Sequence, residues 1–130
     1  MYSATTMGIE VRVTPSYTPE RSAPESGVWF WTYHVEILNH SEEPVQLLAR
    51  HWEITDASGK VQHVRGEGVI GQQPLIPPGE SFHYASGCPL KTDNGIMQGE
   101  YQMADASGRR FMAKIPVFSL DLPRRPQVLN

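Results

Sequence analysis

Apolar and polar side chains alternate along several stretches of this sequence, and turn-forming residues separate the stretches at intervals of roughly 8–12 residues. Ile9, Val11 and Val13 alternate with polar neighbours over residues 9–14, and the same alternation returns over residues 28–39. Successive side chains of a β-strand point to opposite faces, so this pattern indicates strands with one buried face. Further strands are expected over residues 45–55, 60–65, 81–90, 97–104 and 109–117.

The turns indicate how these strands are connected. The tetrapeptide Asp-Ala-Ser-Gly occurs at residues 56–59 and again at residues 105–108. Its Asp can accept hydrogen bonds from the following amides and its Gly can take a positive φ, so each copy is expected to form a hairpin tip. We therefore predict an all-β, immunoglobulin- or fibronectin-III-like sandwich of about seven or eight antiparallel strands. It forms one domain over residues 1–130, with a short flexible N-terminus (1–7) and a C-terminal tail (121–130).

Composition and charge exclude several functional classes. The 11 Lys and Arg residues are scattered among 14 Asp and Glu residues, which leaves no basic stripe for nucleic acid. No apolar run approaches the roughly 20 residues of a membrane span, and residues 1–7 do not resemble a secretory signal. Cys88 is the only cysteine, which excludes an intrachain disulfide and fits a reducing compartment. We expect a cytoplasmic domain that binds neither nucleic acid nor membrane.

Gly66, Gly68 and Gly71 have the spacing G-x-G-x-x-G, which has three interpretations. A dinucleotide fingerprint needs a following helix whose N-terminus meets the pyrophosphate, but here prolines follow. A looser anion or nucleotide site could form from the glycine amides, with Arg65 or Arg50 supplying charge. Alternatively, the glycines provide a bulge or a crossover between sheets. We favour the structural interpretation and keep anion binding as the alternative.

His51 and Glu53 share one face of the expected strand over residues 45–55, and we expect His63 on the neighbouring strand, across the hairpin that follows. Three such ligands could hold a divalent metal ion, although a solvated polar face explains them equally well. No acid, base and nucleophile form a recognisable catalytic set. The histidine close to Cys88 in sequence, His83, is five residues away and belongs to the opposite face of the expected strand. We therefore expect no enzyme activity, no catalytic residue and no cofactor.

Six further segments carry a family resemblance when they are taken together: Arg50–Asp56, Gly66–Pro74, Ile76–Glu80, Tyr84–Gly87, Gly95–Met103 and Ile115–Phe118. With these segments the sequence resembles the ApaG family. The resemblance implies a fibronectin-III-like sandwich and no established catalytic residue. Related domains in larger proteins look like protein-interaction modules, and the bacterial family is associated by name with cobalt and magnesium efflux.

The leading hypothesis is a non-enzymatic binding module that presents a sheet face or a set of loops to a protein partner. That partner could be a second copy of the chain, paired through an edge strand near residues 9–14 or 28–38. The aromatic residues of Trp29–Tyr33 are expected mainly in the core. The alternatives are anion or nucleotide binding through Gly66–Gly71 and a metal-responsive role in Co²⁺ or Mg²⁺ handling.

Overall fold

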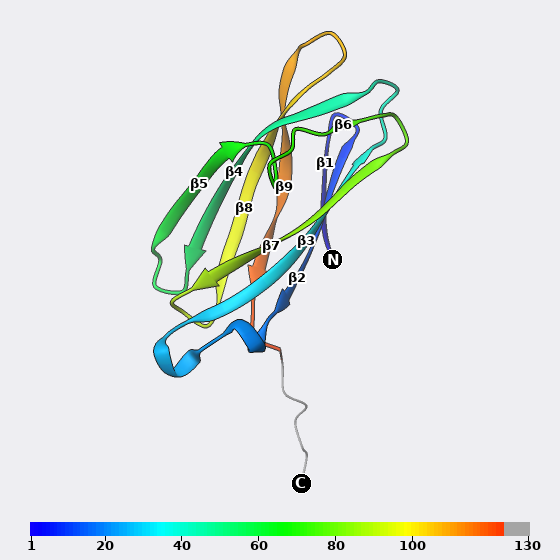
Figure 1. The fold of residues 1–130 in the computed structure, drawn as a ribbon. Coiled ribbons are helices and arrows are strands. Elements are labelled where there is room, and N and C mark those ends of the chain that lie inside the picture. The colour runs from blue at the N-terminus through cyan, green and yellow to red at the C-terminus, as the bar shows by residue number, and fades with distance from the viewer. Residues whose placement is uncertain (124–130) are drawn as a thin grey trace.

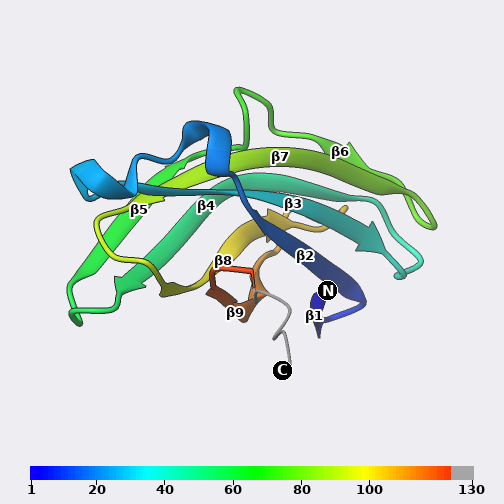
Figure 2. The ribbon, with the colours of Figure 1, turned by 90° about the horizontal axis from the view of Figure 1, so that it is seen from below.

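The computed structural model describes residues 1–123, which form two antiparallel β-sheets packed face to face (Figures 1 and 2). The all-β class and the antiparallel sandwich are as predicted. The first sheet has the order β1 (Tyr2–Thr6), β2 (Ile9–Tyr17), β3 (Trp29–Asn39) and β7 (Ser81–Leu90). The second has the order β5 (Val61–Glu67), β4 (Val45–Asp56), β8 (Gly95–Ala104) and β9 (Arg110–Leu120), and β6 (Leu75–Ile76) also pairs with β4.

Two short 3₁₀ turns, Pro19–Arg21 and Pro24–Ser26, connect β2 to β3. Both copies of Asp-Ala-Ser-Gly form the expected hairpin tips. The carboxylate Oδ1 of Asp56 accepts hydrogen bonds from the amides of Ser58 at 2.9 Å and Lys60 at 3.0 Å, and Gly59 has a φ of +87°. In residues 1–123, no helix is long and apolar enough to span a membrane.

Aromatic side chains from both sheets meet at the centre of the core. Trp52 on β4 packs edge-to-face against Tyr33 on β3, with ring centroids 5.2 Å apart, and against Phe118 on β9 at 6.0 Å. Such pairs contribute about 0.5–1.5 kcal/mol beyond the area that they bury. The aromatic face of residues 28–39 does point into the core, where Trp31 is 1% exposed, whereas Trp29 is only partly buried.

Two β-bulges account for the places where strict alternation gives the wrong face. The pairing of β4 with β8 shifts between Leu47 and Ala49, which lets both Leu47 and Trp52 face the core although their spacing predicts opposite faces. The pairing of β8 with β9 shifts between Met97 and Gly99, where Pro116 and Val117 of β9 lie opposite Gln98 alone. Because of this second bulge, β9 continues past Pro116 to Leu120, beyond the expected end of the strand.

The N-terminal residues expected to be flexible instead form β1, which pairs with β2, and the Tyr2 hydroxyl lies 3.1 Å from Ser119 Oγ. β2 also runs past Pro15, where it was expected to end. A proline is tolerated there because the pairing with β1 stops at Val13 and leaves that flank of β2 unpaired. Of the expected C-terminal tail, residues 124–130 lie outside the described residues.

The edge strands differ from those expected. β2 lies between β1 and β3, and β3 lies between β2 and β7, so the segments 9–14 and 28–38 are inside the first sheet. The edges of this sheet are β1 and β7, and in the second sheet they are β9 and the flank formed by β5 and β6. Any pairing between copies through an edge would therefore use one of these strands.

A Gly99→Ala variant tests the close approach of β4 and β8. A Cβ atom at residue 99 would lie 2.0 Å from the backbone oxygen of His51 and 3.0 Å from its carbonyl carbon. Because both atoms belong to a paired strand, they cannot move away cheaply, and we expect a loss of at least about 2 kcal/mol of unfolding free energy. Denaturant unfolding measures this loss, and Gln98→Ala on the same strand is the control. Equal stabilities of the two variants would contradict the packing described.

Candidate functional site

The glycine-rich stretch forms a tight turn between β5 and β6. The amide of Gln72 donates to the carbonyl of Val69 at 2.9 Å, and the amide of Val69 donates to the carbonyl of Gln72 at 2.8 Å. Ile70 and Gly71 at the tip have φ values of +43° and +74°, the signs that a type I′ turn requires at its two central positions. β5 and β6 pair with the same flank of β4, so the stretch is a bend within one sheet and not a crossover between sheets.

Steric room explains two of the three glycines. A Cβ atom at Gly68 would lie 2.1 Å from the carbonyl oxygen of Gln72, and the φ of Gly68 is +63°. A Cβ atom at Gly66 would lie 2.8 Å from Nη1 of Arg50, whose guanidinium group occupies the space beside that glycine. The spacing of the motif therefore follows from the shape of the turn and from the position of Arg50.

Three amides of the loop, those of Gly68, Val69 and Gln72, already donate to backbone carbonyl groups. The Gly68 amide donates to the carbonyl of Leu48, the bulged residue of β4, at 2.8 Å, and Gln73 Nε2 donates to the same oxygen at 2.9 Å. Arg65 pairs with His51 and lies on the outer face of β5, while the neighbouring Gly66 belongs to the inner face. The predicted anion-binding residues are therefore close in sequence but do not face one common point: Gly66, Gly68, Gly71 and Arg65.

The predicted metal ligands lie on the outer face of the second sheet. Nε2 of His51 and Nδ1 of His63 are 3.0 Å apart, and the two rings are stacked. Glu53 accepts a hydrogen bond from Gln98, and the carboxylate that contacts His51 is Glu100 on β8, 2.9 Å from Nδ1. Over residues 1–123, no three His, Cys, Asp or Glu side chains are gathered in a group that could hold a metal ion.

A mixed apolar and charged surface surrounds His51. Residue Thr55 of β4 pairs with Val61 on one side and with Ile96 on the other, and both apolar side chains are nearly half exposed. Met112 on β9 is 51% exposed and lines a depression of about 580 Å³ with His51 and Glu100. We define the His51 face by its members on four strands: Val61, Arg65, His51, Ile96, Glu100, Met112 and Lys114.

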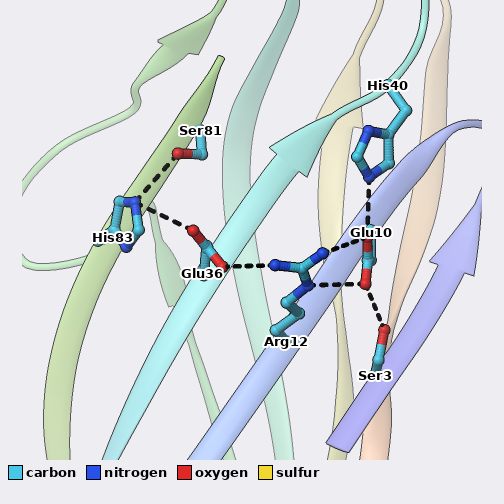
Figure 3. Close-up of polar contacts among 7 residues, drawn as sticks. All are labelled: Ser3, Glu10, Arg12, Glu36, His40, Ser81 and His83. Carbon is cyan, nitrogen blue, oxygen red and sulfur yellow. Dashed lines mark hydrogen bonds and ion pairs between the residues drawn. The ribbon is translucent and has the colours of Figure 1, made fainter. Parts of the chain in front are cut away.

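The outer face of the first sheet carries charges that pair with one another (Figure 3). Glu10 accepts hydrogen bonds at 2.8 Å from Arg12 Nε and from Ser3 Oγ, and it contacts His40 Nε2 at 2.8 Å. Arg12 also reaches Glu36 at 3.2 Å, and the other carboxylate oxygen of Glu36 lies 3.3 Å from Nε2 of His83. The figure shows this chain of contacts crossing all four strands, so the polar groups of this face satisfy one another.

Cys88 lies in the core at 3% exposure, and it is a free thiol. Burial raises the pKa of this thiol to about 11, so it is protonated at neutral pH. A protonated thiol is a poor nucleophile, and the environment of Cys88 is that of a packing residue.

The pH dependence of stability tests the network on the first sheet. Hydrogen bonds from Arg12, His40 and Ser3 lower the pKa of Glu10 from 4.5 to about 2. A carboxylate with a lowered folded-state pKa contributes stability above its unfolded-state pKa and loses that contribution as the pH falls toward the folded value. Between pH 4.5 and 2, wild-type stability should therefore fall more steeply than that of Glu10→Gln.

Denaturant unfolding at several pH values measures these slopes, and Glu25→Gln at an exposed position is the matched control. The control should follow the wild type. Equal slopes for the wild type and Glu10→Gln would show that the network contributes nothing to acid stability.

Comparisons with known proteins agree with one another. The family model described as the ApaG domain matches residues 19–105. "Protein ApaG" of Brucella canis and that of Methylocella silvestris are each 53% identical over 130 residues, with full coverage of both chains. The crystal structure of the putative ApaA protein from Bordetella pertussis has a TM-score of 0.88 and 47% identity, covering 90% of this chain and 95% of the other.

Proposed function

The chain belongs to the ApaG family, and we propose that it is a non-enzymatic binding module that presents the His51 face to a protein partner. The observation that carries this proposal is the difference between the two outer faces. Charges on the first sheet pair with one another at 2.8–3.3 Å, whereas the His51 face combines exposed apolar side chains with two cations and with Glu100, whose contact is His51. Neither Arg65 nor Lys114 has a carboxylate at salt-bridge distance among the residues that the structure describes.

This composition suits a protein interface. Methionine and arginine are enriched at interfaces, so a face that exposes both apolar side chains and charges suits a protein contact. Val61 and Ile96 flank Thr55 on neighbouring strands, and Met112 lies on the other side of the charged row that contains His51. A partner with acidic groups opposite Arg65 and Lys114 would form ion pairs with these two cations and orient the complex.

The proposal extends to the setting of the protein. We place the module in the cytoplasm, because its single cysteine is a free thiol and can form no intrachain disulfide. A role in cobalt and magnesium efflux would then act through the partner and would not require a metal ion bound to this chain. Homodimer formation through an edge strand is another possible use of the module.

Anion or nucleotide binding through Gly66, Gly68 and Gly71 is the alternative. It is less favoured because the amides of Gly68, Val69 and Gln72 already donate to carbonyl groups within or beside the loop. Saturable heat with pyrophosphate or diadenosine tetraphosphate that Arg65→Ala abolishes would support it.

A capture experiment with matched surface variants tests the binding module. Met112→Asp adds a charge at an exposed position of the His51 face, and Thr14→Asp adds the same charge to the outer face of the first sheet. We expect the wild type and Thr14→Asp to recover the same partner from native lysate. The amount recovered by Met112→Asp should be at least tenfold lower. A tenfold loss corresponds to about 1.4 kcal/mol of binding free energy.

Both variants must keep the unfolding midpoint of the wild type for the comparison to hold. Equal recovery on Met112→Asp, or equal loss on both variants, would exclude the His51 face as the contact surface.

A further inference from the structure

The two sheets are joined on one side of the sandwich and open on the other. On the joined side, the amide of Lys114 on β9 donates to Thr6 Oγ1 on β1 at 3.1 Å. On the open side lie the edge strands β5 and β7, and in residues 1–123 no hydrogen bond links these two strands. A partly open cavity of about 210 Å³ lies there, lined from β5 by Gln62 and Val64 and from β7 by Ser86 and Cys88.

Arg50 is the charged residue of this cavity. Arg50 lies two residues before Trp52 on β4, so both side chains belong to the inner face of the sheet. The Arg50 side chain is half-buried there. Its Nη1 donates to the carbonyl groups of Gly68 at 2.9 Å and Glu67 at 3.3 Å. Among residues 1–123, no carboxylate lies at salt-bridge distance from Arg50, and Nε and Nη2 have no hydrogen-bond acceptor.

A half-buried guanidinium group with unused donors favours an anion. Nε and Nη2 still reach solvent, since no buried side-chain nitrogen among the described residues lacks a partner, so an anion in the cavity would replace water there. The planar donor pair of Arg matches a carboxylate. The backbone carbonyls of Glu67 and Gly68 hold the group through Nη1, which leaves Nε and Nη2 free to bind. The site therefore supplies a positioned cation before any ligand arrives.

The other walls of the cavity determine the rest of the ligand. Trp52, Val64 and Met97 provide apolar surface, and Tyr33 and Ser86, which pair directly across β3 and β7, bring hydroxyl groups to the same space. Since a water molecule takes about 30 Å³ of liquid, the volume equals roughly seven waters, less than the ~300 Å³ of a drug-sized pocket. A ligand of about seven to ten non-hydrogen atoms fills this volume.

We propose that this cavity binds a small monocarboxylate, with the carboxylate on Arg50 and a short apolar body against Trp52, Val64 and Met97. Arg50 also borders the depression beside His51. However, Trp52, Val64 and Met97 line the cavity and not that depression, so the apolar walls distinguish the site from the proposed protein-binding surface. An inorganic anion would use the charge of Arg50 but leave the apolar walls without a contact. The combination of cation and apolar wall selects the organic acid.

The test uses benzoate, which has nine non-hydrogen atoms, as the probe and amide chemical shifts as the measurement. We expect saturable shifts at residues of β5 and β7 around the cavity, with a Kd of about 1 mM or tighter. Arg50→Met keeps the side-chain stem but removes the charge, and it should weaken binding at least tenfold. Two control variants change the outer face of the second sheet: Arg65→Met removes a charge next to Gly66, and Met112→Asp adds one to the His51 face. Both should bind benzoate as the wild type does.

Neutral benzamide on the wild-type protein gives the same information without a substitution, so the test stands even if Arg50→Met fails to fold. Benzamide should bind at least tenfold more weakly than benzoate. The proposal is overturned by non-saturable shifts, by equal binding of benzamide, by equal binding of inorganic phosphate, or by shifts confined to the His51 face. Because Met112→Asp separates the two surfaces, failure of this proposal is distinguishable from failure of the protein-binding module.

Discussion

The packing of Trp52 between the two sheets is the contact on which the rest of the structure depends. Its ring meets Tyr33 from the first sheet and Phe118 from the second, and it can do so only because β4 bulges at Leu48. The bulge leaves the Leu48 carbonyl outside the regular ladder, and an unpaired buried carbonyl destabilises a fold. The glycine-rich turn supplies the missing donors through the Gly68 amide and the Gln73 side chain. A requirement of the core thus determines the shape of a surface loop.

The same bulge separates the two surfaces to which we assign binding. Beyond Leu48, Arg50 and Trp52 point inward while His51 points outward, so one strand contributes to the inter-sheet cavity and to the His51 face. Gly66 completes the arrangement, because its missing side chain leaves room for the Arg50 guanidinium group. By contrast, the ion pairs of Glu10, Arg12 and Glu36 leave the opposite outer face satisfied by its own contacts.

Local sequence rules predicted the parts of the structure that depend on local chemistry. Alternation located the strand that carries Trp31 and Tyr33, and the Asp56–Gly59 turn followed from its residue types. The bulges, the strand β1 and the edges of the sheets were missed, because they depend on pairing between distant segments. Of the two predicted partners of His51, His63 does lie 3.0 Å away, whereas the carboxylate in contact is Glu100 on β8 and not Glu53. The contact between the Arg50 guanidinium group and Gly66 depends on the pairing of β4 with β5, which neither strand's own sequence indicates.

The difference in stability between Gly68→Ala and Gly71→Ala tests most directly whether the glycine motif is a structural bend. Both residues have a positive φ, so both variants carry a backbone strain of order 1 kcal/mol. Only Gly68 faces a backbone oxygen, 2.1 Å from its added Cβ atom, whereas nothing lies within 4 Å at Gly71. Denaturant unfolding should therefore show Gly68→Ala to be less stable than Gly71→Ala by about 1 kcal/mol or more. Equal stabilities, with pyrophosphate binding lost in Gly68→Ala alone, would contradict the account and place an anion site in the loop.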